Sequence, residues 1–194
     1  MKHSKLILFL SIFIMLFTSC SERDKDVTIL AIGDSNIARW PLDATLPSQL
    51  VYNYGLSGSG IDYIEKLSIY TDTNDVAMVM IGTNDKKYYL NEPVDEYVER
   101  YLSAISRIDC NKIYLYSILP RRFATDPADI NKKIANLNAK IQEALPVYPK
   151  IEYIDVFDFF MDGDDINYQY YTDGLHLNDY GYEILSSALL KRLN

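Results

Sequence analysis

The stretch "VTILAIGDSNIARW", residues 27–40, is the part of the sequence that decides the fold. Its first six residues form a short apolar run, which predicts a buried strand. Gly33 then permits a sharp turn, and Ser35 follows that turn near the start of a predicted helix. A serine in this position can present its hydroxyl above the edge of a sheet. Ser35 is therefore a candidate nucleophile.

The rest of the chain also alternates short apolar runs with longer stretches of helical period. Strands are predicted at residues 27–32, 76–81, 112–119 and 151–156, with a weaker strand at 50–54. Helices are predicted at 93–108 with Pro93 near the first turn, at 126–145 with Asp126 as N-cap, and after Asn178. Nearly continuous apolar strands that alternate with helices predict a parallel five-stranded sheet covered on both faces, a three-layer α/β/α fold.

The carboxyl ends of the strands indicate where a ligand would bind. In open parallel sheets, ligands bind in the crevice beyond these ends. The loops that start at Gly33, Gly55, Gly82 and Pro120 are therefore expected to share one rim.

The N-terminal residues 1–19 have the pattern of a lipoprotein signal peptide. Two lysines precede an apolar stretch at residues 6–17, which is too short to span a bilayer comfortably. The stretch ends in "FTSC", which resembles the lipobox of bacterial lipoproteins, with Cys20 as the lipidated residue. Residues 20–26 would then be a tether and 27–194 the folded domain, exported and lipid-anchored in the bacterial cell envelope, on the periplasmic or surface face of the outer membrane. An ordinary secretory signal with a chance cysteine is the alternative.

Composition and net charge indicate which classes of molecule the protein can bind. The 194 residues are 48% hydrophobic, which is enough for one domain with a sizeable core. Cleavage before Cys20 removes two lysines and no acids, and takes the net charge from −8 to −10. Such a surface repels nucleic acid, whereas a neutral or acyl-bearing small molecule or glycan suits it. Cys110 would then be the one free thiol, so neither a disulfide nor a cysteine-based metal site is expected, and the oligomeric state is left open.

The stretch "YTDGLHLNDYGY", residues 171–182, contains the only histidine outside the predicted signal peptide, His176. A serine hydroxyl is a weak nucleophile unless an adjacent base takes its proton, and that base is usually a histidine held by a carboxylate. Asp173, three residues earlier, can reach back across the turn, and Gly174 allows the tight backbone geometry. Ser35, His176 and Asp173 are therefore the predicted catalytic triad.

Acyl transfer also needs hydrogen-bond donors aimed at the developing oxyanion. The loop "IGTND" offers the side-chain amide of Asn84, and "NYGLSGSG" offers the backbone N–H of Gly55. The N–H of Ser35 itself is the third predicted donor. Gly58 and Gly60 are interpreted as loop geometry, because "GLSGSG" matches no phosphate-binding pattern.

Together these stretches resemble the SGNH, or GDSL-type, hydrolases, which are named for a serine, glycine, asparagine and histidine in four separate blocks. The blocks here are "GDS" with Ser35, "NYGLSG" with Gly55, "GTND" with Asn84, and "DGLH" with Asp173 and His176. The resemblance covers residues 29–193. It implies an esterase or acylhydrolase with a flavodoxin-like sheet, with Ser35 as nucleophile, His176 as base and then acid, and Asp173 orienting the histidine.

The same resemblance implies an oxyanion hole made by Ser35, Gly55 and Asn84, and chemistry without metal or cofactor. The flanking sequences are most similar to the acetylhydrolase and carbohydrate-esterase branch, so a short acyl group such as acetyl is the expected leaving acid. Asn36 departs from the family pattern, because many relatives carry Ile or Leu after the serine. Two other functions stay open: a lysophospholipase or thioesterase on longer chains, and a binding lipoprotein without turnover.

Each candidate residue also has a structural interpretation. Ser35 could be a helix N-cap, and His176 could be bonded to a turn. Asp85 is expected to do structural work in its loop. Five tyrosines flank the predicted site and could line it or simply pack there: Tyr88, Tyr89, Tyr168, Tyr170 and Tyr171. Arg121 and Arg122 could contact substrate, but they are expected to be solvated surface residues.

Overall fold

The central sheet contains the five strands that the sequence predicts. In a computed structural model, which describes residues 28–69, 71, 75–90 and 94–193, all five run parallel in the order β2-β1-β3-β4-β5. The strands are β1 (Thr28–Gly33), β2 (Leu50–Gly55), β3 (Val76–Met80), β4 (Lys112–Tyr116) and β5 (Ile151–Ile154). This order is that of flavodoxin-like sheets. The predicted parallel α/β/α fold is confirmed.

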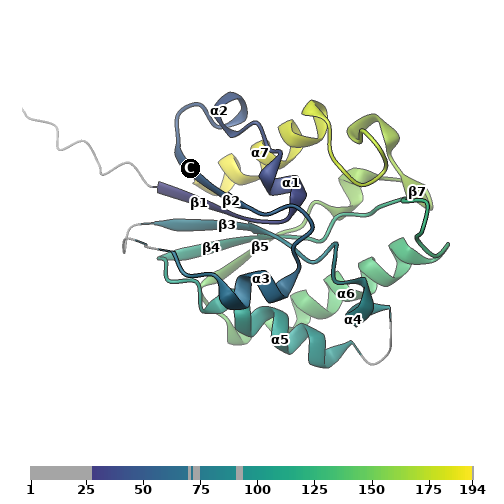
Figure 1. The fold of residues 1–194 in the computed structure, drawn as a ribbon, viewed down its shortest axis with the longest axis horizontal. Helices are drawn as coiled ribbons and strands as arrows, with labels where there is room; N and C mark the ends of the chain where they lie inside the picture. Colours follow the sequence, from purple (N-terminus) through teal and green to yellow (C-terminus); the bar gives the residue numbers. More distant parts are fainter. Residues whose placement is uncertain (1–27, 70, 72–74, 91–93, 194) are drawn as a thin grey trace, which may run out of the picture.

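Helices cover both faces of the sheet (Figure 1). On one face lie α1 (Ser35–Ala38), α2 (Leu42–Thr45) and α7 (Asp179–Leu193), and on the other lie α3 (Ile61–Lys66), α5 (Asp95–Ser106) and α6 (Ile130–Ala144). The remaining short elements are α4 (Lys86–Tyr89), η1 (Leu145–Val147), η2 (Phe157–Phe160), β6 (Met161–Asp162), β7 (Asp165–Ile166) and η3 (Tyr168–Tyr170). Each face of the sheet therefore has a hydrophobic core of its own.

Strand β1 shows why the strand sequences are apolar at almost every position. Leu30 and Ile32 belong to the core shared with α3, α5 and α6. Ile29 and Ala31 belong to the core shared with α1, α2 and α7. Because successive side chains of a strand point to opposite faces, a strand covered on both faces buries every residue.

Two of the predicted strands end two or more residues earlier than their sequences suggest. The apolar run at 112–119 leaves the sheet after Tyr116, and the run at 151–156 leaves it after Ile154. Ile118 is still buried, but its backbone N–H and C=O pair with the side chain of Asn138, at 3.0 and 2.9 Å. The hydrophobic pattern cannot mark this end, because the residues beyond it are buried as well.

The helix ends also differ in detail from the prediction. Helix α6 begins at Ile130, and Asp126 does not cap it; the Asp126 carboxylate instead accepts hydrogen bonds from Arg121 Nε and Lys86 Nζ, both at 2.8 Å. Asn178 does cap α7, because its Oδ1 accepts the N–H of Gly181 at 3.2 Å. Pro93 lies outside the described residues.

The predicted signal peptide at 1–19, the lipidation residue Cys20 and the tether at 20–26 also lie outside the described residues. Within the described part of the chain, no helix has both the length and the apolar character needed to cross a bilayer.

Candidate active site

Ser35 is the first residue of α1, two residues beyond the last residue of β1 at the carboxyl end of that strand. The turn between strand and helix requires glycine at position 33, because a Cβ there would lie 2.0 Å from the carbonyl oxygen of Met80. The carboxylate of Asp34 then caps the helix by accepting the N–H of Asn36 at 2.9 Å. This turn and cap fix Ser35 at the rim of the sheet, as the sequence predicts.

The loop before α7 brings His176 and Asp173 to the same place, although His176 follows Ser35 by 141 residues. His176 Nε2 lies 3.1 Å from Ser35 Oγ, and His176 Nδ1 lies 2.7 Å from Asp173 Oδ2. The other oxygen of Asp173, Oδ1, accepts the N–H groups of Leu175 and His176 at 3.0 and 2.8 Å. The three side chains therefore form one hydrogen-bonded line with the arrangement of a catalytic triad.

Gly174 allows this loop to turn tightly and to dock on the segment after β4. Its φ of +79° lies in the left-handed region, and a Cβ would lie 2.3 Å from the carbonyl oxygen of Arg122. The N–H of Arg122 donates to the Gly174 carbonyl at 2.8 Å, which ties the two loops together. The expected role of Gly174 is confirmed.

The negative charge of Asp173 helps to orient the imidazole of His176. Partial burial alone would raise the pKa of Asp173, but hydrogen bonds from the His176 ring and from the N–H groups of His176 and Leu175 lower the pKa to about 2. Asp173 is therefore a carboxylate at neutral pH and attracts a proton to Nδ1. Nε2 is then left as the acceptor that faces the hydroxyl of Ser35.

Two of the three predicted oxyanion donors have a hydrogen that no described residue accepts. The backbone N–H of Ser35 has no acceptor among the described residues. Asn84 donates one amide hydrogen to the carbonyl of Ser59 at 2.9 Å, which fixes the amide plane and leaves the second hydrogen available.

Gly55, the third predicted donor, does not fit that role in this structure. Its N–H donates to Asn53 Oδ1 at 2.8 Å and is therefore occupied. Glycine is required at this position for another reason, because a Cβ would lie 2.2 Å from the backbone nitrogen of Ala38, where the end of β2 packs against α1. Position 55 thus serves the packing of β2 against α1.

Gly58, which the sequence indicates only as part of the loop geometry, has the properties that Gly55 lacks. It is exposed, its φ is +79°, and its N–H has no acceptor among the described residues. The next residue, Ser59, anchors the loop between two parts of the site, because its hydroxyl donates to the Gly33 carbonyl at 3.2 Å and its carbonyl accepts Asn84. No sequence pattern alone separates a free N–H from an occupied one.

Asp85 holds the loop that carries Asn84. Its Oδ2 accepts the N–H of Ile61 and the hydroxyl of Tyr97, both at 2.9 Å. Burial raises the pKa of Asp85, against the lowering effect of these two hydrogen bonds. The predicted structural role of this residue is confirmed.

Arg121 lies beneath the same loop, and the prediction that it is a solvated surface residue is wrong. It is 3% exposed, its Nη1 donates to the carbonyl of Thr83 at 2.8 Å, and its Nε donates to Asp126. A buried guanidinium is tolerated here because a carboxylate and a carbonyl satisfy it. Arg122, by contrast, lies at the surface beside Asp165, at 2.9 Å.

The tyrosines near the site fall into two groups. Tyr89 and Tyr171 are buried, and their hydroxyls donate to the carbonyls of Thr83 and Pro120 at 3.3 and 2.7 Å, so they hold loops in place. The other three reach the surface: Tyr88, Tyr168 and Tyr170.

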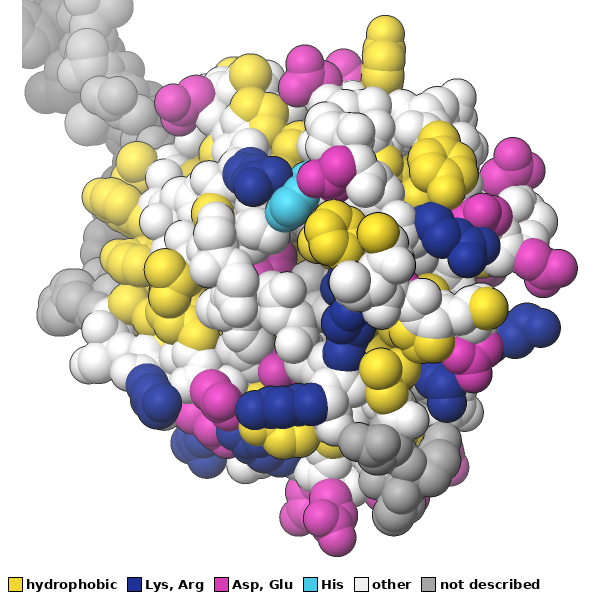
Figure 2. Space-filling view, turned by 45° about the vertical axis from the view of Figure 1, so that its right-hand side comes forward, with side chains coloured by type: hydrophobic (Ala, Val, Ile, Leu, Met, Phe, Trp, Pro, Cys, Tyr) yellow, Lys and Arg dark blue, Asp and Glu magenta, His cyan; other side chains and the backbone are white. Residues whose placement is uncertain are grey.

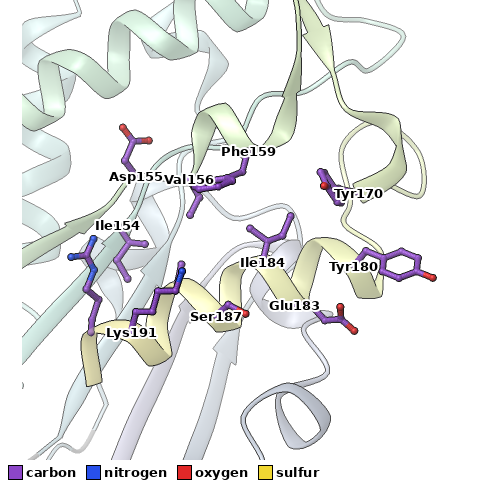
Figure 3. A pocket seen from close by; sticks show the side chains of 12 residues that line it. Ile154, Asp155, Val156, Phe159, Tyr170, Tyr180, Glu183, Ile184, Ser187 and Lys191 are labelled. Atoms are coloured by element: carbon purple, nitrogen blue, oxygen red, sulfur yellow. The ribbon is translucent and has the colours of Figure 1, made fainter. Parts of the chain in front are cut away.

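The imidazole of His176 reaches the surface of the molecule, where Figure 2 shows it in cyan next to an acidic side chain. A cavity of about 700 Å³ lies elsewhere, between β5 and α7, with Phe159, Tyr170 and Ile184 around it (Figure 3). Neither Ser35 nor His176 lines that cavity. Among the described residues, no His, Cys, Asp and Glu side chains are grouped in threes that could hold a metal ion.

Asp34 is a second carboxyl group directly beside Ser35. It is 2% exposed, and this burial raises its pKa from 3.8 to about 7, against the lowering effect of the hydrogen bond from Asn36. The unfolded chain loses this proton near pH 3.8, whereas the folded protein keeps it until about pH 7. The contribution of Asp34 to stability is therefore greatest below pH 3.8 and is lost as the pH rises to about 7.

Asp34→Asn should accordingly stabilise the protein at pH 8. The expected gain in the free energy of unfolding is on the order of 4 kcal/mol at pH 8, and it should shrink towards zero near pH 4. The asparagine Oδ1 can still accept the Asn36 N–H, so the cap of α1 is kept. Urea unfolding at pH 4, 6 and 8 measures this gain in the free energy of unfolding.

The exposed Asp43 in α2 is the control, because Asp43→Asn should change stability by no more than about 0.5 kcal/mol at any of these pH values. A gain that does not depend on pH would contradict the prediction.

Comparison with known proteins places this geometry in a family. The model of the GDSL-like Lipase/Acylhydrolase family matches residues 31–184, a span that includes all three residues of the hydrogen-bonded line. The solved structure of a Streptococcus pneumoniae protein named for platelet activating factor is 30% identical, with a TM-score of 0.73, and covers 90% of this chain and 87% of its own.

More distant relatives carry names of acetyl esterases. The alpha1 subunit of platelet-activating factor acetylhydrolase IB from Rattus norvegicus is 23% identical over 178 residues, which are 87% of this chain and 75% of that protein. The acetylxylan esterase Axe2 from Geobacillus stearothermophilus shares the fold, with 18% identity and a TM-score of 0.62 over 87% of this chain and 94% of its own. A 60-residue match, 37% identical, to erythronate-4-phosphate dehydrogenase of Wigglesworthia glossinidia brevipalpis spans only 15% of that protein.

Proposed function

Given that this chain belongs to the GDSL-like lipase/acylhydrolase family and is a hydrolase acting on ester bonds, we propose that Ser35 is its nucleophile. The observation that carries the proposal is the hydrogen-bonded line from Ser35 through His176 to Asp173, at 3.1 and 2.7 Å. A serine attacks an ester only when a base takes its proton, and His176 is placed to do so.

The reaction would proceed through an acyl-enzyme. Ser35 Oγ bonds to the ester carbonyl carbon while its proton moves to His176 Nε2. The resulting imidazolium, stabilised by the Asp173 carboxylate, returns that proton to the leaving alcohol as the C–O bond breaks, and the acyl group stays on Ser35. Water then attacks the acyl carbon and gives its proton to His176, which passes it to Ser35 as the acid leaves. No step requires a metal or a cofactor.

The negative oxygen of each tetrahedral intermediate would be stabilised by three donors. They are the N–H of Ser35, the side-chain amide of Asn84 and, in place of Gly55, the N–H of Gly58. Two of the three N–H groups belong to the backbone and the third to an amide that Ser59 holds at 2.9 Å, so none must reorganise during the reaction.

The substrate we propose is an ester of a short acyl group, acetyl among them, on a carbohydrate or another small molecule. The name of the rat relative, an acetylhydrolase, supports this, and His176 reaches the surface (Figure 2), where a substrate can meet it. The fold likeness to an acetylxylan esterase is compatible with a glycan ester. A lysophospholipase or thioesterase on longer chains remains the second candidate.

We also propose that the protein is a lipoprotein of the cell envelope, attached through Cys20 after removal of residues 1–19. The sequence "FTSC" and the polar residues that follow it support this. The membrane would then be a partner only through the lipid, and the substrate would be met outside the cytoplasm.

A series of 4-nitrophenyl esters tests the acyl preference. If the substrate carries a short acyl group, we expect kcat/KM to be highest for acetate and to fall roughly tenfold or more by octanoate. A rise in kcat/KM with chain length would favour the lysophospholipase alternative. Labelling with a fluorophosphonate tests the nucleophile in the same sample, because the adduct should map to the peptide that contains Ser35 and grow in step with the loss of hydrolysis. An unlabelled and inactive protein would contradict the proposal.

A further inference from the structure

Asn36, the residue after Ser35, makes contacts that nothing in the proposed reaction has used so far. It is 4% exposed, and its side chain reaches the loop that carries His176. Its Nδ2 donates to the carbonyl of Leu175 at 3.3 Å, and its Oδ1 accepts the N–H of Leu177 at 3.2 Å. One carboxamide therefore holds the backbone on both sides of His176.

The backbone of Asn36 is itself fixed by two further hydrogen bonds. Its N–H donates to Asp34 Oδ1 at 2.9 Å, and its carbonyl accepts the hydroxyl of Tyr182 in α7 at 2.9 Å. The carboxamide thus projects from a part of α1 that is anchored at the strand turn and at the last helix. This makes Asn36 a rigid connection rather than a mobile surface contact.

Other hydrogen bonds of the His176 loop serve different purposes. Those accepted by Asp173 lie within the loop, and the bond between Arg122 and Gly174 ties the loop to the segment after β4. Among the described residues, the side-chain hydrogen bonds that join the neighbours of His176 to α1, the helix of Ser35, come from Asn36. They lie closer to the histidine than the bond from Tyr182 of α7 to the Asn36 carbonyl, because they reach the residues directly before and after His176.

We propose that Asn36 is a positioning residue, whose side chain sets the distance and angle between His176 Nε2 and Ser35 Oγ by holding the backbone on both sides of the histidine. This inference rests on the proposed function, because the geometry it protects is that of the nucleophile and its base. An apolar residue at position 36 would pack in the same space, but it would leave the partly buried carbonyl of Leu175 and the buried N–H of Leu177 without these partners. The departure of this chain from the Ile or Leu of many relatives thus has a role.

Asn36→Ala tests the proposal by kinetics. We expect kcat for 4-nitrophenyl acetate to fall about 10- to 100-fold with KM within about threefold of the wild-type value, because a misplaced base affects the transition state and not substrate binding. Asn138 provides a matched control, since its carboxamide makes the same pair of bonds to the backbone of Ile118, at 3.0 and 2.9 Å, and is 3% exposed. Asn138→Ala should lose stability to a similar degree but keep kcat within about twofold.

Asn36→Asp tests the same proposal through the pH dependence of kcat. It also provides a test if the alanine variant does not fold. Its carboxyl group can accept from Leu177 in either state, but it can donate to the Leu175 carbonyl only when protonated. The ratio of its kcat to that of the wild type should therefore rise as the pH is lowered. A ratio that stays constant with pH would contradict the need for both bonds.

A spectroscopic readout separates this inference from the proposed function. The ¹H–¹⁵N imidazole signal of His176, assigned by its loss in His176→Asn, should shift or broaden in Asn36→Ala and stay unchanged in Asn138→Ala. If the wild type shows no Ser35-dependent turnover, the proposed function fails, and this signal alone still decides the role of Asn36. If Asn36→Ala keeps the wild-type kcat and the wild-type signal, the positioning role is overturned while the function stands.

Discussion

Replacing Ser35 with alanine should lower kcat for 4-nitrophenyl acetate by about 10⁴- to 10⁶-fold. The loss is this large because the other two members of the triad act only through the serine: without Oγ, His176 has no hydroxyl to deprotonate and no acyl-enzyme forms. The change removes one oxygen atom whose hydrogen-bond partner, His176 Nε2, lies near the surface. The thermal unfolding temperature should therefore change little, and initial rates measured beside a thermal melt give both quantities.

Ser186 in α7 offers a control for this substitution. It is a buried serine whose Oγ has no hydrogen-bond partner among the described residues, so Ser186→Ala removes the same atom without breaking a contact. Its kcat should equal that of the wild type. Equal activity of Ser35→Ala and wild type would show that another group is the nucleophile.

Asp173→Asn should lower kcat by about 10⁴-fold while the protein stays folded. The asparagine oxygen can replace Oδ1 and still accept the N–H groups of Leu175 and His176, so the loop keeps its shape. Its NH₂ group then faces His176 Nδ1 as a donor, which forces the imidazole proton onto Nε2. In that tautomer Nε2 cannot accept the proton of Ser35.

Asp129→Asn is the matched control for the charge, because Asp129 is an exposed carboxylate at the start of α6 whose ion pair among the described residues is with Lys133, at 3.5 Å. It should leave kcat within about twofold, since exposed pairs of this kind contribute little. Stopped-flow or plate-based measurements of kcat for both variants, with circular dichroism to confirm folding, test the orienting role of Asp173. An Asp173→Asn enzyme that retains more than about a tenth of the wild-type kcat would refute the orienting role.

The fold was predictable from periodicity because the sheet is buried on both faces. Ile29 and Leu30 are successive residues of β1 that enter different cores, and this two-sided burial produces the apolar runs from which the strands were predicted. The ends of the strands were less predictable. Beyond β4 the chain stays buried, and the carboxamide of Asn138 takes over the hydrogen bonds of Ile118 that a neighbouring strand would otherwise make. Apolar character reports burial, not strand pairing.

The site was predictable where residue type alone decides the chemistry, and not where local hydrogen bonding decides it. Ser35, Asp173 and His176 follow from the need for a nucleophile, an orienting acid and a base at one rim. The availability of a backbone N–H at Gly55 depends on the side chain of Asn53, two residues away, and the sequence does not show where that side chain points. The prediction that Arg121 is exposed was wrong for a similar reason, because the carbonyl that its guanidinium binds belongs to Thr83, 38 residues away along the chain.

The distance along the chain between Ser35 and His176, 141 residues, has a consequence for the timing of activity. Ser35, the proposed nucleophile, follows β1, whereas His176, its proposed base, precedes α7, the helix that completes one face. A nascent chain that has folded around β1 and β3 holds a serine with no general base and is chemically inert. Contacts between residues so far apart form late, after the cost of closing a long loop has been met. Under the proposed mechanism, ester hydrolysis therefore begins only when folding is complete. The time at which hydrolysis begins in a refolding experiment then measures when α7 docks on the sheet.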